Sequence, residues 1–313
     1  MKKILLLFLL LFTILVAIAL IPFNEEIAVK INASYFNCFQ QVVNAKGWQK
    51  WHPVISKSFI RDSALYKATP VAQGFKFSLP DGYFLVKHLY SNTILVNSML
   101  ANNNFNYSYT IIPDSIGLST TIIVNFKSNI IKHFFTALKK SGLNKTGIRD
   151  FKHYMEDPKL YYGFNIREGF LDEKKIIVKR KTFLSKELFT QAFEMEQQLN
   201  SYILLKHLKQ TGPLMVQYLN KQNDSVQMMV GMPVDAAIVS DNDFLYMKIP
   251  ATKVLMADFK GKYFDRQKVY TAIGKYIQDK YFHVKIAPFE IFEGKFPAQG
   301  SDMADFKLTY PVF

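Results

Sequence analysis

The chain has 313 residues, of which 49% are hydrophobic and 15% aromatic, so its length and composition predict two packed domains and exclude extensive disorder. Cys38 is the only cysteine, which excludes an intramolecular disulfide, and we interpret it as a buried thiol. The net charge of +14 is spread along the chain without a helix-turn-helix, zinc-finger or aromatic-basic sheet motif, so we expect no nucleic-acid partner.

The N-terminus has the pattern of a membrane-spanning helix. Lys2 and Lys3 precede an uncharged run at residues 4–23, which as a helix is long enough to cross the roughly 30 Å hydrocarbon core of a bilayer. A cleaved signal peptide is the alternative, because Ala17-Ile18-Ala19 has the form that signal peptidase accepts, but the length of the run favours an uncleaved anchor. With both lysines in the cytoplasm, we expect residues 1–23 to be a single-pass anchor in a bacterial inner membrane and the following domains to be periplasmic.

The first domain, residues 24–160, shows the pattern of an antiparallel meander between helices. A strand at Glu26–Ile31 precedes an amphipathic helix that begins near Ser34. After the last strand the apolar spacing is helical again, with a break at Gly142 and an end near Glu156. Turn residues separate five alternating segments, which predict strands at residues 74–79, 83–90, 93–100, 106–112 and 119–126.

Trp48, Trp51 and Pro53 follow the first helix, and the last helix ends with Phe151-Lys152-His153-Tyr154-Met155-Glu156. With the order of strands and helices, these features resemble the START-like or SRPBCC superfamily, often called polyketide-cyclase-like. The resemblance implies a helix-grip domain, in which a curved sheet holds a long helix around a hydrophobic cavity for a lipid-like or aromatic ligand; it implies no reaction. Trp48 is a candidate to line this cavity, whereas Trp51 is interpreted as a core plug and His52 as a surface or capping residue.

The second domain, residues 161–313, contains an internal repeat. Tyr202-Ile203-x-x-Lys206 recurs 74 positions later as Tyr276-Ile277-x-x-Lys280. Met232-Pro233-Val234 recurs 78 positions later as Tyr310-Pro311-Val312. A duplication of this size predicts two halves packed about a pseudo-twofold axis, with a cleft where they meet.

The hydrophobic patterns of this domain predict two tandem β-α-β-β repeats, at about 174–235 and 244–313. The whole chain is therefore expected to be of the α+β class, and both helices of the second domain are expected on one sheet face with the other face free. The first repeat has predicted strands at 176–183, 214–219 and 226–233 and a helix at 185–208. The second has strands at 244–259, 289–292 and 306–312 and a helix at 265–281.

Five motifs of the second domain occur in the order of a known family. They are Thr211-Gly212-Pro213-x4-Tyr218, Met232-Pro233-Val234, Met247-x-Ile249-Pro250 with Gly261, Pro288-Phe289-Glu290-Ile291-Phe292, and Tyr310-Pro311-Val312. They resemble the GyrI-like family, the gyrase-inhibitor and AraC-type effector-binding domain. The resemblance implies a cleft that binds small, often cationic or aromatic molecules, with Glu290 as the pocket glutamate. Regulators of that family carry a helix-turn-helix, which this chain lacks, so we do not expect transcriptional control.

The strand at 289–292 provides the main candidate for ligand contact. Glu290 and Phe292 share one strand face, so Phe289 and Ile291 are expected to pack under the helices while Glu290 points into the cleft. Val216 stands 74 positions before Glu290, so the repeat itself does not require a carboxylate there. The alternative is a solvated carboxylate on an open strand face. The predicted ligand-binding residues are Glu290, Phe292, Tyr218, Tyr246 and Tyr263 in the cleft, with Tyr270 as a further wall candidate and Trp48 in the first domain.

Three functions fit these patterns. The leading prediction is a membrane-anchored, non-catalytic protein that binds a small amphipathic or cationic molecule in the cleft and a hydrophobic ligand in the first domain. Some GyrI-like proteins resemble hydrolases of strained rings, so a hydrolase of small electrophilic molecules with Glu290 as acid or base is the alternative. Two ligand-free interaction modules are the third reading, which predicts filled clefts. The six histidines lack metal-ligand spacing and no cofactor motif is present, so we expect neither metal nor cofactor; the oligomeric state stays open.

Overall fold

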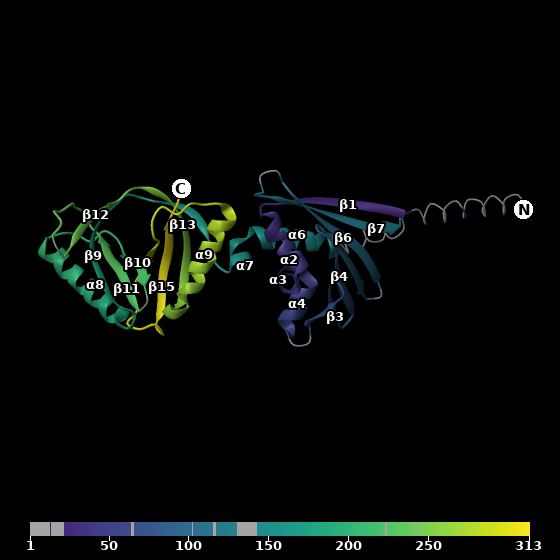
Figure 1. Cartoon of the computed structure of the whole chain (residues 1–313), viewed down its shortest axis with the longest axis horizontal. Coiled ribbons are helices and arrows are strands. Elements are labelled where there is room, and N and C mark those ends of the chain that lie inside the picture. The colour runs from purple at the N-terminus through teal and green to yellow at the C-terminus, as the bar shows by residue number, and fades with distance from the viewer. Residues whose placement is uncertain are drawn as a thin grey trace, which may run out of the picture. The chain divides into compact units, whose positions relative to one another are not determined.

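Two compact units make up the structure, a computed structural model that describes Thr13 and residues 22–63, 66–101, 103–114, 117–129, 143–222, 224–241 and 243–313. Unit 1 is Met1–Asp157 and unit 2 is Pro158–Phe313 (Figure 1). The predicted membrane span lies outside the described residues, except for Thr13 and for Pro22 and Phe23, which belong to the first strand. No helix in the described part of the chain is long and apolar enough to cross a membrane.

Unit 1 is built on an antiparallel sheet with the strand order β1-β7-β6-β5-β4-β3-β2. Consecutive strands pair from β2 to β7, which is the predicted meander, and β1 returns beside β7. Gly82, the first residue of β4, has φ +152°, and a side chain there would meet the Met99 carbonyl oxygen, so this position requires glycine. The strands are β1 (Pro22–Ile31), β2 (Ala68–Val71), β3 (Gly74–Leu79), β4 (Gly82–Tyr90), β5 (Thr93–Leu100), β6 (Asn103–Pro113) and β7 (Thr120–Asn129).

The first helix of unit 1 begins where the sequence predicted. Ser34 caps the first helix by accepting a hydrogen bond from the Asn37 amide at 3.4 Å. The segment after this helix forms two further short helices, because Pro53 suits the first turn of a new helix. The predicted helical segment before Gly142 lies outside the described residues. The described helices are α2 (Tyr35–Val43), α3 (Ala45–Trp51), α4 (Pro53–Arg61) and α6 (Leu143–Glu156).

An aromatic cluster fills the core of unit 1. The Trp48 ring is completely buried, and its centroid lies 4.6 Å from that of Trp51 and 6.1 Å from that of Tyr109. Trp48 therefore packs as a core plug and presents no exposed ring face. His52 is also buried, not on the surface, but it does cap α4, since its Nδ1 accepts a hydrogen bond from the Ile55 amide at 3.5 Å. Burial lowers the pKa of His52 to about 3.

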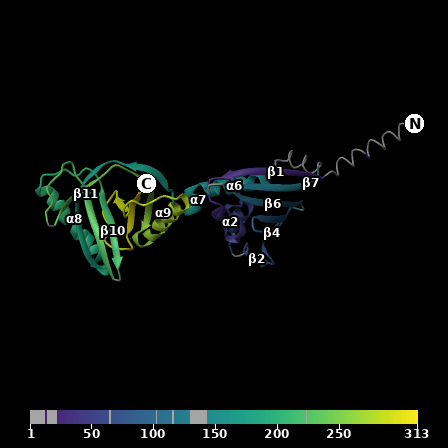
Figure 2. The same cartoon turned by 45° about the horizontal axis from the view of Figure 1, so that its top comes forward.

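Unit 2 is built on an antiparallel sheet with the strand order β12-β9-β11-β10-β14-β15-β13-β8. In Figures 1 and 2, α8 and α9 flank β10 in both views. The strands are β8 (Arg167–Leu171), β9 (Lys174–Leu184), β10 (Leu214–Gln222), β11 (Ser225–Pro233), β12 (Leu245–Ile249), β13 (Thr252–Lys262), β14 (Phe289–Phe292) and β15 (Met303–Pro311). The helices are α7 (Pro158–Tyr162), α8 (Leu188–Leu205) and α9 (Gln267–Lys280), and the 3-10 turns η1 (Ser185–Glu187) and η2 (Tyr263–Arg266) precede α8 and α9.

The sheet of unit 2 is symmetric about its centre. The strands β9, β11 and β10 on one side mirror β13, β15 and β14 on the other, and each half has its own helix. Val216 of β10 pairs directly with Glu290 of β14, which is its repeat counterpart, so the pseudo-twofold axis runs between these two residues. The outer strands are exchanged: β8 precedes β9 in the chain but pairs with β13, and β12 precedes β13 but pairs with β9. The predicted strand at 244–259 is therefore two strands in opposite halves of the sheet.

Both faces of this sheet carry apolar side chains. Val216 and Phe292 belong to the large core cluster that includes the buried faces of α8 and α9. Phe289 packs in a second cluster on the opposite face, with Ile291 at its edge. The predicted orientation of β14 is thus reversed: Phe292 and Glu290 face the helices, and the other face is not free. Because β14 carries a large apolar side chain on each face, its sequence does not reveal which side the helices cover.

Candidate functional site

Glu290 lies at the centre of unit 2, on the helix-facing side of β14. Its neighbours across the sheet are Val216 on β10 and Leu308 on β15, both apolar and buried. The side chain of Glu290 is 0% exposed. A buried ionisable carboxyl destabilises the fold unless hydrogen bonds or opposite charges compensate it. The groups that contact Glu290 therefore determine its charge and its reactivity.

Two tyrosine hydroxyls bind the carboxyl, one from η2 and one from α9. Tyr263 begins η2 and donates to Oε2 of Glu290 at 2.5 Å. Tyr270 in α9 donates to Oε1 at 2.8 Å. The hydroxyl of Tyr218, on β10, lies 2.6 Å from that of Tyr263. Because Tyr263 uses its proton for the carboxyl, Tyr218 is left to donate to Tyr263, and the three groups form a hydrogen-bonded chain.

Arg266, at the end of η2, supplies the positive charge of the site. Its Nε lies 3.5 Å from Oε1 of Glu290, and the Arg266 side chain is 24% exposed. Its guanidinium carbon lies 4.1 Å from the centroid of the Tyr263 ring and 5.3 Å from that of Tyr218. The guanidinium thus makes an ion pair and two cation–π contacts at once, at the rim of an otherwise buried cluster.

The surroundings shift the acidity of Glu290 towards neutral pH. Burial raises the pKa of Glu290 from 4.5 to about 7, and the Tyr263 hydrogen bond, the Arg266 charge and the Tyr270 hydrogen bond oppose this rise. Burial and the neighbouring carboxylate raise the pKa of Tyr263 and Tyr270, so both hydroxyls stay protonated and remain donors. Glu290 can therefore exchange a proton, or accept hydrogen bonds as an anion, close to neutral pH.

Phe292 forms the floor beneath this cluster. Its ring is 1% exposed, and its centroid lies 6.2 Å from that of Tyr263, 5.3 Å from that of Phe296 and 5.2 Å from that of Phe306. Phe292 is on the same strand face as Glu290, as predicted. Its contacts are those of a core residue that supports Tyr263, and it has no open face of its own.

Two predicted binding residues lie elsewhere in the molecule. Tyr246 is on β12, which β9, β11 and β10 separate from β14, a distance of about 19 Å at the usual spacing of strands. Trp48 lies in the core of unit 1. Within unit 2, the structure therefore brings Glu290, Phe292, Tyr218 and Tyr263 together, and it places Tyr246 away from them.

Arg266 is the member of the site that sequence reasoning missed. Tyr263, Arg266 and Tyr270 are spaced by three and four residues, which places them on one face of a helix. This spacing, read next to the strand that bears Glu290, is a signal that could have found Arg266. Among the residues that the structure describes, no group of three or more His, Cys, Asp or Glu side chains could hold a metal ion.

Comparisons with known proteins give distant similarities. No protein-family model and no curated protein matches this sequence. Among solved structures, the chain is similar to a cryo-EM structure of an EcmrR–DNA complex, with 15% identity over 58% of this chain and 71% of that chain and a TM-score of 0.44. It is also similar to the EcmrR C-terminal domain (14% identity, 48% and 98% covered, TM-score 0.39) and to SAV2435 bound to tetraphenylphosphonium (13%, 47% and 93%, TM-score 0.33). Similarities at these scores do not identify a family, so the GyrI-like resemblance rests on the five motifs.

Proposed function

We propose that this chain is a small-molecule-binding protein whose amphipathic or cationic ligand binds at Glu290 of unit 2. The observation that carries the proposal is a carboxyl with no exposed surface inside a hydrophobic core. Val216, its repeat counterpart and cross-strand neighbour, fills the equivalent position with an apolar side chain. The scaffold therefore has no structural need for a carboxyl there, and carboxyls with strongly shifted pKa values are concentrated at functional sites.

The groups around Glu290 suit a flat molecule with a positive or hydrogen-bonding end. The aromatic rings of Tyr218, Tyr263 and Tyr270 offer stacking surfaces, and a cation over such a ring gains on the order of 1 kcal/mol. With a pKa of about 7, Glu290 is available both as an anion for a cationic ligand and as an acid for a hydrogen-bonded one. This combination supports an amphipathic or cationic ligand rather than an anionic one.

Calorimetric titration of the full chain with planar organic cations tests the proposal. Glu290→Gln keeps the shape of the side chain and removes its charge, so we expect at least about tenfold weaker binding, equivalent to about 1.4 kcal/mol. Glu293→Gln is the matched control, because Glu293 is exposed just after β14 and should not affect the affinity. The proposal fails if the wild-type chain shows no saturable binding. Equal affinity in Glu290→Gln would show that the carboxyl of Glu290 does not contribute to binding.

A hydrolase is the second candidate, because a carboxyl with a pKa of about 7 suits general acid or base catalysis. Glu290 has no exposed surface, however, and Tyr263, Tyr270 and Arg266 surround its carboxyl, so a reacting water can reach it only if one of these groups moves. Turnover of a small electrophilic molecule that disappears in Glu290→Gln, while binding persists, would favour the hydrolase. Unchanged turnover in the variant would exclude Glu290 as the catalytic group.

We also propose, from the sequence alone, that residues 4–23 anchor the chain in a bacterial inner membrane with both units on the periplasmic side. Alkaline extraction of membranes tests the anchor, because an integral helix stays in the membrane pellet. Release of the chain into the soluble fraction, with an N-terminus near Ala19, would support the cleaved signal peptide instead.

A further inference from the structure

Arg266 stands in the place that a cationic ligand would need. The best contacts for a flat cation in this cluster are the face of Tyr263, the face of Tyr218 and the carboxylate of Glu290. The Arg266 guanidinium, itself a flat delocalised cation, already makes all three contacts at 4.1, 5.3 and 3.5 Å. The chain thus fills the cation position of its own site.

We propose that Arg266 is a built-in competitor, and that the ligand is a planar, delocalised organic cation that replaces its guanidinium on the tyrosine rings and beside Glu290. This inference rests on the proposed function, and it adds the class of ligand and the residue that sets its affinity. Charge balance is the first reason. Glu290 provides one negative charge, so a second cation beside Arg266 would leave an uncompensated positive charge in a largely buried cluster.

The position of Arg266 allows its side chain to leave. It lies at the rim with 24% of its side chain exposed, at the junction of η2 and α9. Besides Glu290, its guanidinium donates a long hydrogen bond of 3.3 Å to the carbonyl oxygen of Tyr263, in its own turn. The neighbouring carboxylate of Asp265 is already paired with Lys268 at 2.8 Å. A rotation of the Arg266 side chain towards solvent therefore breaks few contacts other than those that the ligand replaces.

The exchange discriminates between a cation and a neutral molecule of the same shape. When a cation takes the place of Arg266, Glu290 keeps a counter-ion and the tyrosine rings keep a partner. When a neutral molecule does so, the buried carboxylate loses its positive partner, which is costly in a medium of low polarity. The neutral molecule therefore competes poorly with Arg266, and the site selects for positive charge.

Fluorescence titrations of the full chain with 10-methylacridinium, a permanent cation, and with neutral acridine at pH 8 test this inference. Arg266→Gln removes the competitor, so we expect it to bind the cation about tenfold more tightly than the wild type. Arg266→Lys keeps the charge but replaces the flat fork by a strongly hydrated point charge, so we expect a smaller increase. Lys268→Gln is the control for net charge, because it removes an exposed positive charge two residues away and should leave the affinity unchanged. Thermal melting confirms that each variant is folded.

The outcomes separate the inference from the function on which it rests. Tighter cation binding in Arg266→Gln than in both the wild type and Lys268→Gln supports the competitor. Equal or weaker cation binding in Arg266→Gln, or an equal gain in Lys268→Gln, overturns the inference and leaves the proposed function standing. If Arg266→Gln does not fold, Arg266→Lys decides by the same comparison. Tighter binding of acridine than of the cation by the wild type overturns the charge selection, and no binding of either probe by any variant refutes the proposed function itself.

Discussion

Replacing Glu290 by glutamine should change how the stability of unit 2 depends on pH. Burial raises the folded-state pKa of Glu290 from 4.5 to about 7, so between these values the folded chain holds a proton that the unfolded chain has released. The contribution of this group to stability is therefore fully present below pH 4.5 and is lost as the pH rises through about 7. Glu290→Gln has no titrating group at this position and should lack that loss.

The two pKa values set the size of the effect. Ionisation of Glu290 should lower the free energy of unfolding of unit 2 by about 2–3 kcal/mol between pH 5 and pH 8, since each pKa unit corresponds to about 1.4 kcal/mol. The carboxyl is fully buried, so screening by solvent does not reduce this figure. Other titrating groups act equally in both proteins and cancel in the difference. The stability of Glu290→Gln relative to the wild type should thus rise by this amount over the same pH range.

Urea denaturation at pH 5, 6.5 and 8 measures the difference. Both tryptophans of the chain, Trp48 and Trp51, lie in unit 1, so tryptophan fluorescence follows unit 1, and far-ultraviolet circular dichroism adds the transition of unit 2. Glu293→Gln, with an exposed carboxyl removed close by, should keep the wild-type pH dependence. Parallel pH profiles for the wild type and Glu290→Gln would refute a raised pKa at Glu290 and with it the electrostatic basis of the site.

Three further predictions concern both units. His52 should make unit 1 sensitive to acid, because burial lowers its pKa from 6.5 to about 3 on folding. The stability that His52 contributes is present above pH 6.5, and about 2 kcal/mol of it is lost at pH 5. Urea denaturation followed by tryptophan fluorescence, with His52→Asn for comparison, measures this loss. Gly274→Ala should raise the free energy of unfolding of unit 2 by about 0.5–1 kcal/mol, because a methyl group in the middle of α9 meets no atom within 4 Å. Gly231→Ala should lower it, because its methyl group would collide with that of a valine. Urea denaturation measures both changes. Glu290→Val should destabilise unit 2 by about 1–3 kcal/mol, since it strands buried hydroxyls, and adding Tyr263→Phe should recover part of this loss in the same assay.

Local patterns were sufficient to predict most strands of both units. The segment predicted at 93–100 is β5, along which buried positions alternate with partly buried ones, as a strand requires. Where the pattern depended on distant contacts, prediction failed. The interrupted strand at 244–259 is β12 and β13, and their placement in opposite halves of the sheet follows from pairing with β9 and β15, which no local pattern encodes. The helices α3 and α4 were not predicted, because Pro53 can either end a helix or begin one.

The part of the candidate site that could be predicted is the part in which the two repeats differ in sequence. Comparison of the repeats singled out Glu290 against Val216, and the structure places these two residues side by side. Tyr246 was predicted beside them because its strand was assigned to the second repeat, but β12 is exchanged to the outer edge of the first half. Arg266 was missed because a charged residue before a helix usually faces solvent, and the sequence does not show that η2 turns this side chain onto the Tyr263 ring.

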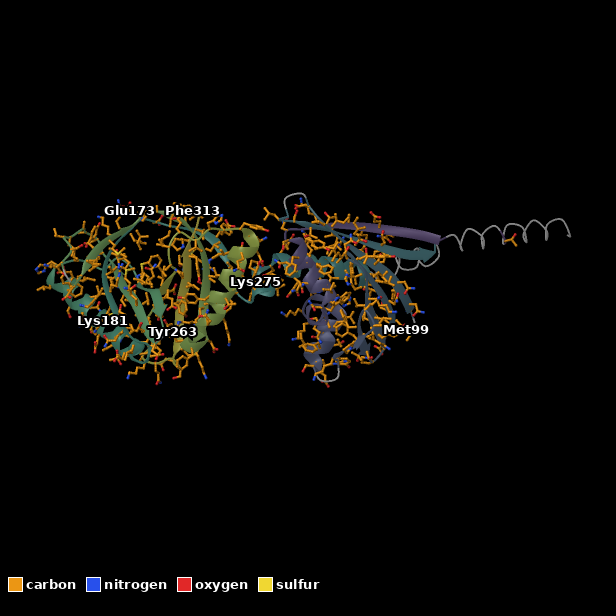
Figure 3. The ribbon with its side chains drawn as sticks, viewed as in Figure 1. Met99, Glu173, Lys181, Tyr263, Lys275 and Phe313 are labelled. Carbon is orange, nitrogen blue, oxygen red and sulfur yellow. The ribbon has the colours of Figure 1, made fainter. Side chains whose placement is uncertain are left out.

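The hydrogen bond between Tyr263 and Glu290 has no counterpart in the first repeat, because both of its residues are different there. Tyr263, labelled in Figure 3 between the ends of α8 and α9, donates to Glu290, whereas Ser185 and Val216 occupy the equivalent positions of the first repeat. The backbone around these positions is the same, since the hydrogen bond from the Ser185 amide to a carbonyl 39 residues later recurs at Tyr263. Each of these groups would destabilise the fold without the others. The buried carboxyl needs its hydrogen-bond donors, the buried hydroxyl needs its acceptor, and the Arg266 guanidinium needs its counter-ion. Because the first repeat forms the same strands, turn and helix without them, the fold itself does not require the cluster, which agrees with the proposal that Glu290 and Arg266 serve a ligand.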